Sequence, residues 1–203
     1  MKTIIIFYPY EFNVYSKFKR KVSRILNNLD AYNVVFTADD RGFIKKFFSE
    51  IEQEVKVEVA AVLSLGDTEV NHAIVFDDGA SFPDLISELQ DKQITYRLVK
   101  IPITRVINIK KQPTYQGVKK TANYEYIGRG SYWGNPYSMH EAGDDRDEVI
   151  RKYKYDFDND KFPNKKKADV LMLTGKKLGC FCKPAVCHGD VLADYLNSLD
   201  DKK

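Results

Sequence analysis

The N-terminal half of the chain alternates between short apolar runs and amphipathic segments, and this alternation constrains the fold more than any other feature. Residues 3–7 form a β-branched run suited to a central buried strand. The next segment carries apolar residues at three- and four-residue steps, which predicts a helix: Val14, Phe18, Val22, Ile25, Leu26 and Leu29. Further strands are expected at 33–37, 55–65, 73–76 and 94–101, and further helices at 40–51 and 82–89. Strands that alternate with helices predict a three-layer α/β domain with a mostly parallel sheet.

Two loops of this domain have residues suited to a ligand. Such sheets bind ligands beyond the carboxyl ends of their strands, and residues 66–68 and 77–81 stand at such ends. Both loops also fit an alternative, in which a glycine makes a turn and the acidic residues are simply solvated. We therefore expect a degenerate, non-catalytic first domain at residues 1–104.

Residues 105–122 combine prolines, glycines, tyrosines and lysines with a falling apolar density. This composition predicts a basic connector, although residues 106–109 can still form a strand. Lysines among tyrosines also suit a nucleic-acid backbone and its bases, so nucleic acid is one possible partner of this segment. Residues 123–203 are then a second, smaller α/β domain with the site.

Composition and charge exclude several classes of protein. The chain has 203 residues and a net charge of +3, so bulk charge does not favour nucleic-acid binding. No apolar run approaches the roughly 20 residues of a membrane span, and no membrane partner is expected. All three cysteines fall close together near the C-terminus, which favours reduced thiols over a disulfide frame. We expect a cytoplasmic protein.

Residues 128–137 form a glycine-rich loop with the properties of a ligand-binding loop. Arg129 offers a fork of donors to a phosphate or carboxylate, and Trp133 is a candidate for stacking on a base. The glycines permit close backbone approach to a ligand. The alternative is a structural turn held by a buried tryptophan. The ligand-binding candidates of this loop are Arg129, Gly130, Ser131, Trp133 and Gly134, and Asn135 is a catalytic candidate.

The segment 176–190 concentrates the chemistry of the chain and leaves three interpretations open. In the first, Cys180, Cys182, Cys187 and His188 bind a zinc ion, although their spacing is unlike that of ordinary zinc fingers. In the second, Cys187 or Cys182 is a reactive thiol, since a helix N-terminus beside a histidine lowers a thiol pKa. In the third, the thiols pack while neighbouring groups hold a ligand. Strand alternation predicts that Phe181 faces away from Cys180 and Cys182.

Three sequence blocks resemble a family of phage and bacterial proteins, the domain of unknown function 4326. The blocks are residues 129–136, residues 145–153 and residues 171–192. The resemblance implies that motif positions are occupied by Arg129, Ser131, Gly134, Asn135, Arg146, Lys176, Cys180, Cys182, Cys187, His188 and Asp190. Residues 73–81, with the helix and strand after them, resemble the Rossmann-like nucleotide-sensing superfamily of lysine-decarboxylase-like hydrolases and DNA-processing A proteins. That family's glycine-rich phosphate loop is absent here, which implies a degenerate Rossmann-like parallel sheet.

Two hypotheses of function follow. The first is an enzyme that acts on a nucleotide, nucleoside or modified nucleobase, at a glycosidic-bond or base-modifying step. Its phosphate ligands would be Arg129 and Arg146, with Lys176 and Lys183 as further ligand-binding cations. Its catalytic residues would be Cys187 as nucleophile, His188 or Asp190 as acid and base, and Asn135 to orient the substrate. The second is a binding module that sequesters a nucleotide or binds nucleic acid or a host defence protein, with a structural cysteine cluster.

Overall fold

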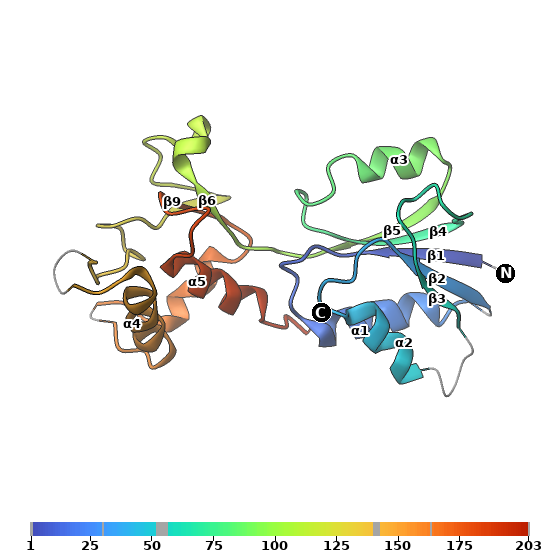
Figure 1. The fold of residues 1–203 in the computed structure, drawn as a ribbon, viewed down its shortest axis with the longest axis horizontal. Coiled ribbons are helices and arrows are strands. Elements are labelled where there is room, and N and C mark those ends of the chain that lie inside the picture. Colours follow the sequence, from blue (N-terminus) through green and yellow to red (C-terminus); the bar gives the residue numbers. More distant parts are fainter. Residues whose placement is uncertain (1, 30, 52–56, 140–142, 163, 203) are drawn as a thin grey trace. The chain divides into compact units, whose positions relative to one another are not determined.

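Residues 2–101 build a five-stranded parallel sheet whose strand order is β3-β2-β1-β4-β5. The computed structural model describes residues 2–29, 31–51, 57–139, 143–162 and 164–202. The strands are β1 (Lys2–Phe7), β2 (Tyr32–Phe36), β3 (Val59–Ala61), β4 (His72–Asp77) and β5 (Thr95–Lys100). The helices are α1 (Tyr15–Leu26), α2 (Phe43–Ile51) and α3 (Leu85–Asp91). In Figure 1, α1 and α2 cover one face of the sheet and α3 covers the other, so the expected three-layer α/β class is confirmed.

The loops that follow these strands show why the first domain lacks an open phosphate-binding loop. Beyond β4, the carboxylate of Asp77 accepts from the N–H of Gly79, and Asp78 accepts from Ala80 and Ser81. These backbone donors, which a phosphate loop would offer to a ligand, are bonded to the loop's own acids. In the second candidate loop, Asp67 accepts from the N–H of Ser64 at 2.6 Å. Both loops are therefore closed turns.

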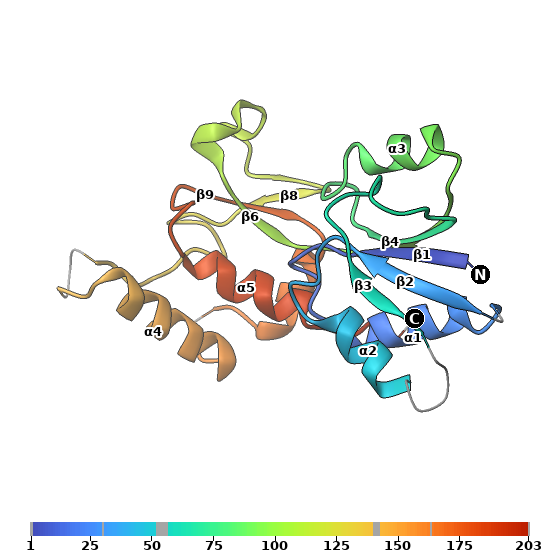
Figure 2. The same ribbon diagram turned by 45° about the vertical axis from the view of Figure 1, so that its right-hand side comes forward.

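Residues 102–199 form the second unit, which has a four-stranded sheet of order β6-β9-β8-β7. Its strands are β6 (Arg105–Asn108), β7 (Lys120–Thr121), β8 (Tyr124–Tyr126) and β9 (Lys177–Cys180). Its helices are α4 (Arg146–Asp158) and α5 (His188–Asn197), with short 3₁₀ helices η1 (Ile109–Lys111), η2 (Pro113–Tyr115) and η3 (Lys167–Leu173). Figure 2 shows α5 beside β6 and β9. None of the helices described is long and apolar enough to cross a bilayer.

The expected connector at 105–122 belongs to the second unit, and the chain divides between residues 101 and 102 instead. The reason is strand pairing, because Val106 and Ile107 pair in parallel with Leu178 and Gly179 of β9. Tyr115 stacks on Tyr124 at 4.3 Å between ring centroids, so this tyrosine packs against protein. The first unit also takes residues 200–203.

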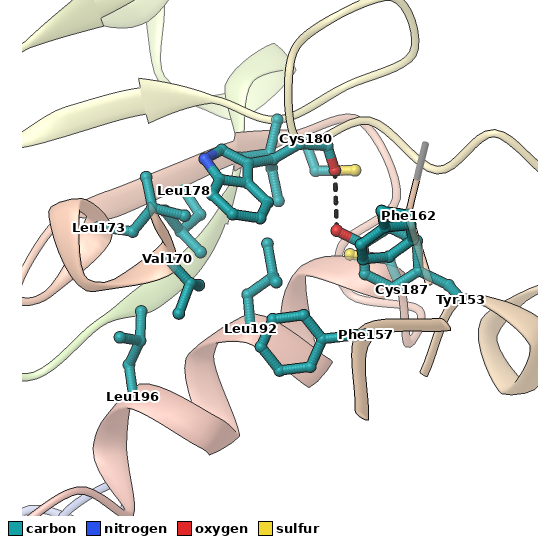
Figure 3. Packing of buried hydrophobic residues seen from close by; sticks show 12 residues of the cluster. Tyr153, Phe157, Phe162, Val170, Leu173, Leu178, Cys180, Cys187, Leu192 and Leu196 are labelled. Atoms are coloured by element: carbon teal, nitrogen blue, oxygen red, sulfur yellow. Dashed lines mark hydrogen bonds between the residues drawn. The ribbon is translucent and has the colours of Figure 1, made fainter. Parts of the chain in front are cut away.

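A single core holds the second unit together. Trp133 is 1% exposed and packs with residues from α4, α5 and β9. The hydroxyl of Tyr153 donates to the carbonyl of Trp133 at 3.0 Å, which joins the 128–137 loop to α4. Figure 3 shows Cys180 and Cys187 in this core beside Tyr153 and Phe162. Both thiols are thus buried, with Cys180 3% and Cys187 2% exposed.

Candidate functional site

One cavity of about 200 Å³ in the second unit gathers half of the predicted site residues. It is formed by the 128–139 loop, the first turns of α4, and the segment from Cys180 to His188. Its walls consist of Gly128, Arg129, Asn135, Tyr137, Met139, Arg146, Val149, Ile150, Cys180, Phe181, Cys182, Cys187 and His188. Among the described residues, these walls contain two arginines and no carboxylate. The cavity is therefore suited to an anion.

The three cysteines come together at this cavity. The Sγ atoms of Cys180 and Cys182 are 3.3 Å apart, and all three sulfurs lie within 4.8 Å of one another. Cys180 ends β9, whereas Cys187 precedes α5 as its N-cap residue. Asn108 of β6 donates to the carbonyl of Lys183 and so holds the loop between these cysteines. Three sulfurs at this separation can bind a metal ion.

The electrostatics of the cluster differ from the prediction for Cys187. Its thiol hydrogen-bonds the sulfur of Cys180, and this bond lowers the pKa of Cys180 and, together with burial, raises the pKa of Cys187. Burial also raises the pKa of Cys182, and the guanidinium of Arg146 opposes that shift. The direction of the shift at Cys187 is therefore opposite to the expected lowering of its pKa.

His188 lies in the cavity wall but outside the group of metal-binding atoms. Its Nε2 lies 2.8 Å from the carbonyl oxygen of Ile127, so Nε2 carries the hydrogen and donates it. Burial is the main cause that lowers its pKa, which keeps the ring neutral. Among the described residues, the metal-binding group consists of the three cysteines alone. Of the predicted set, the structure thus brings the three cysteines together and places His188 outside the group.

Asp190 and Lys183 hold each other outside the cavity walls. The carboxylate of Asp190 accepts from the N–H of Cys187 at 2.9 Å and pairs with the Nζ of Lys183 at 2.6 Å. This arrangement caps the N-terminus of α5 and is typical of an acidic residue in a first helical turn. The predicted catalytic role of Asp190 and ligand role of Lys183 therefore have no geometric support.

Both predicted phosphate-binding arginines line the cavity. Arg129 is exposed, and its Nη2 lies 3.4 Å from the Oγ of Ser138. Arg146 is the first residue of α4, where a positive charge opposes the helix dipole. Its Nη1 lies 3.4 Å from the carbonyl oxygen of Val186, and its guanidinium approaches the sulfur of Cys182. Among the contacts between described residues, these long ones leave most of the guanidinium donors available to a ligand.

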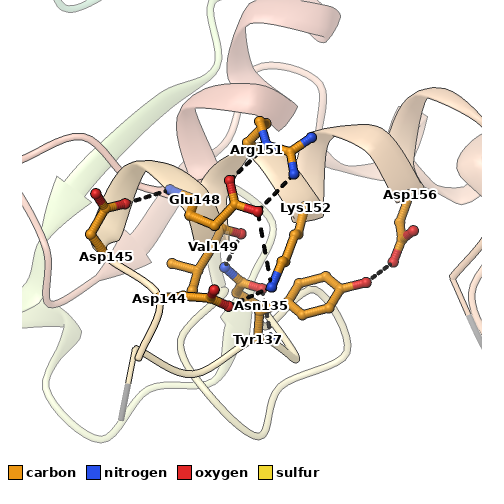
Figure 4. A network of polar contacts seen from close by, with 9 residues as sticks. All are labelled: Asn135, Tyr137, Asp144, Asp145, Glu148, Val149, Arg151, Lys152 and Asp156. Atoms are coloured by element: carbon orange, nitrogen blue, oxygen red, sulfur yellow. Dashed lines mark hydrogen bonds and ion pairs between the residues drawn. The ribbon is translucent and has the colours of Figure 1, made fainter. Parts of the chain in front are cut away.

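Asn135 lines the cavity and also fastens the loop to α4 (Figure 4). Its Nδ2 donates to the carbonyl of Val149 at 3.1 Å, and its Oδ1 accepts from the N–H of Tyr137 at 2.9 Å. The hydroxyl of Tyr137 donates in turn to Asp156. Asn135 thus positions the cavity wall through two protein contacts.

Four other predicted ligand residues occupy structural positions. Trp133 is buried in the core and cannot stack on a base, so its predicted role is wrong. Gly134 packs so closely that an added Cβ would lie 2.6 Å from the carbonyl oxygen of Gly128. Gly130 has a φ of +80°, which a turn requires, and Ser131 has a buried hydroxyl outside the cavity. These residues shape the loop.

Lys176 forms a partly buried ion pair with Glu125. Its Nζ lies 3.0 Å from the Oε2 of Glu125, and the two side chains are 11% and 14% exposed. Lys120 approaches the same carboxylate at 3.5 Å. Lys176 thus lies outside the cavity walls, and its charge neutralises the carboxylate of Glu125 in β8.

Sequence reasoning missed the aromatic residue at the rim of the cavity. Phe181 is 50% exposed and lines the cavity together with Cys180 and Cys182. The prediction that Phe181 faces away from the two cysteines fails because β9 ends at Cys180 and the chain turns. The Nζ of Lys110 lies 5.8 Å from its ring centroid. The position of Phe181 between two cysteines of the motif is the sequence signal that could have identified it as a site residue.

Comparisons with known proteins agree with both resemblances. The sequence profile of the minimal SLOG domain matches residues 1–107, and that of the domain of unknown function DUF4326 matches residues 107–198. The chain is 43% identical over 74 residues to the "Uncharacterized 12.4 kDa protein in nrdA-td intergenic region" of Enterobacteria phage T4. This match covers 36% of the chain and 67% of the phage protein. No solved structure matches the chain.

Proposed function

The chain belongs to the minimal SLOG domain family through residues 1–107, and from the charge of the cavity in the second unit we propose that this unit binds a phosphate-bearing nucleotide or a nucleoside-like ligand. SLOG domains are generally nucleotide-related. The observation that carries the proposal is the pair Arg129 and Arg146 on a cavity whose described walls contain no carboxylate. The phage T4 relative supports a phage-type protein.

The ligand would lie with its phosphate on the arginines and its base on Phe181. Guanidinium groups bind phosphate oxygens through paired hydrogen bonds. The half-exposed ring of Phe181 offers a stacking face, which Trp133 does not. The cavity of about 200 Å³ is smaller than most ligand pockets, so part of the ligand would extend over the rim.

The proposed cofactor is zinc, held by Cys180, Cys182 and Cys187. Thiolates are soft ligands that select zinc and similar metals. Free thiols persist in a reducing compartment, so the proposed location is the cytoplasm of the host cell.

The thiol cluster favours an enzyme as a second candidate function, acting at a glycosidic bond or on the base. Among the described residues of the cavity wall, the three sulfurs, alone or with a metal, offer nucleophilic or Lewis-acid chemistry, whereas Asp190 is engaged in the helix cap. If the protein catalyses no reaction, the same cavity would serve a module that sequesters a nucleotide. The partner of such a module would be a host defence protein or nucleic acid.

Calorimetric titration of the whole chain tests the proposal. A panel of nucleosides and their mono-, di- and triphosphates should bind only when phosphate is present. Arg146→Ala should weaken binding at least about tenfold, since a charged hydrogen bond contributes about 1.5–3 kcal/mol. Arg151→Ala is the matched control, because Arg151 lies on the same helix and pairs with Glu148 at the surface. Equal binding of nucleosides and nucleotides, or no binding at all, would contradict the proposal.

Product analysis then separates the two candidates. Each phosphate compound is incubated with the protein and with Cys180→Ser, and products are identified by mass spectrometry. Turnover that disappears in the variant while binding persists supports the enzyme. Tight binding without turnover supports the module.

A further inference from the structure

The three sulfurs provide three of the four ligands that a zinc ion takes. Thiolates about 2.3 Å from one zinc ion lie about 3.8 Å apart in a tetrahedral site. The observed separations, from 3.3 Å for Cys180 and Cys182 to less than 4.8 Å overall, bracket this value. Small rotations of the side chains would therefore bring all three sulfurs to one ion.

The fourth position has no cysteine, histidine or carboxylate donor among the described residues. His188 lies outside the group, because neither of its ring nitrogens is within 4.8 Å of all three sulfurs, and its Nε2 donates to the carbonyl of Ile127. The acid nearest in sequence, Asp190, is bonded to the N–H of Cys187 and to Lys183. All three cysteines also line the cavity, so the free side of the cluster faces the cavity.

Arg146 stands beside this free side. Its guanidinium contacts the sulfur of Cys182 and lies in the same wall. Three thiolates and one Zn²⁺ carry a net charge of −1, which by itself disfavours a further anion. The adjacent guanidinium offsets that charge and can direct an anionic oxygen to the metal.

We infer that Cys180, Cys182 and Cys187 form an open three-thiolate metal centre whose fourth ligand is a phosphate oxygen of the molecule bound in the cavity. This inference rests on the proposed function, because it gives the proposed ligand a direct bond to the metal. Closed structural zinc sites have four protein ligands, whereas an open position is typical of catalytic sites. The centre therefore connects ligand binding to metal coordination.

Cobalt substitution tests the inference. The whole chain is loaded with Co²⁺, and its sulfur-to-cobalt charge-transfer and d–d bands are recorded during titration with inorganic phosphate. The expected result is a tetrahedral spectrum with charge-transfer intensity of three thiolates, whose d–d bands shift on addition of phosphate. Arg146→Ala should keep the charge-transfer bands and weaken the phosphate response at least tenfold, while Arg151→Ala should leave both unchanged.

His188→Gln checks the excluded ligand, since its side-chain amide can also donate to the carbonyl of Ile127. An unchanged cobalt spectrum is expected, and a loss of coordination in this variant would overturn the three-thiolate assignment. A spectrum that phosphate does not alter would overturn the open position. If nucleotides still bind in the calorimeter in that case, the proposed function stands alone. Bound iron with acid-labile sulfide would overturn the mononuclear centre.

Discussion

The carboxylate of Asp190 accepts a hydrogen bond from the N–H of Cys187 at 2.9 Å, three residues before it on the same helix end. This contact makes Asp190 a cap that fixes the third cysteine of the cluster. Asp190→Ala should lower the free energy of unfolding by about 1 kcal/mol, the usual contribution of a cap. Asp190→Asn should lower the free energy of unfolding by less, because the amide oxygen of asparagine can still accept the hydrogen bond from the N–H of Cys187. Urea unfolding measures both. Full stability of Asp190→Ala combined with lost turnover would indicate a chemical role instead.

Trp133 is expected to stabilise the second unit without contacting the ligand. Trp133→Ala should cost about 3–5 kcal/mol, because it removes the largest side chain of a packed core. Circular dichroism during urea unfolding measures this loss. Since the chain has one tryptophan, the wild-type fluorescence reports the second unit, and nucleotide addition should not quench it by stacking. Strong quenching with a contact-dependent spectral shift would contradict the buried position.

Phe181 should contribute to ligand affinity instead. Phe181→Ala is expected to weaken nucleotide binding by about 1–3 kcal/mol, the usual value of one base stacked on an aromatic ring. Tyr155→Ala is the control, since Tyr155 is 52% exposed on α4 and does not line the cavity. Calorimetric titration compares the two variants. Equal affinities in both would remove Phe181 from the site.

Lys176 should matter for stability and not for binding. Lys176→Met leaves the partly buried carboxylate of Glu125 with Lys120 at 3.5 Å, so we expect a loss of about 1.5–3 kcal/mol, the usual value of a hydrogen bond to a charged group. The double variant with Glu125→Leu should recover part of the loss, because no unpaired charge then remains. Nucleotide affinity should stay unchanged in both. A weaker affinity at full stability would restore the ligand role of Lys176.

Acid should weaken the attachment of the C-terminal segment to α1 in the first unit. Hydrogen bonds from Arg20 and then Ser16 hold the pKa of Asp200 well below its usual range. A lowered folded-state pKa means that this contribution is complete above the unfolded pKa of about 3.9 and is lost as pH falls below it. Asp200→Asn should therefore be less stable than the wild type at pH 7, and the difference should shrink in acid.

Circular dichroism and fluorescence distinguish this effect from a general loss of stability. Asp200→Asn should shift the transition seen by circular dichroism and leave that of Trp133, in the second unit, in place. Glu88→Gln, which removes an exposed carboxylate on α3, should shift neither transition. If the difference in stability between Asp200→Asn and the wild type stayed the same at low pH, the result would contradict the ion pair between Asp200 and Arg20.

The sequence by itself determined the α/β class, the positions of most helices and strands, and the gathering of the three cysteines. These features depend on local periodicity and on spacings of a few residues, so neighbouring sequence contains the necessary information. Cys180 and Cys187, for example, are only seven residues apart. The arginine at the start of α4 was also noticeable in the sequence, because its charge opposes the helix dipole.

Only the tertiary structure decided which polar and aromatic residues face the cavity. Lys176 meets a carboxylate 51 residues away, and Trp133 is covered by α4, whose Tyr153 lies 20 residues further along the chain. Partners this distant are chosen by packing, and burial removes a side chain from ligand contact whatever its chemistry. Phe181 lies at the rim because β9 ends at Cys180, two residues before the end of the predicted strand alternation.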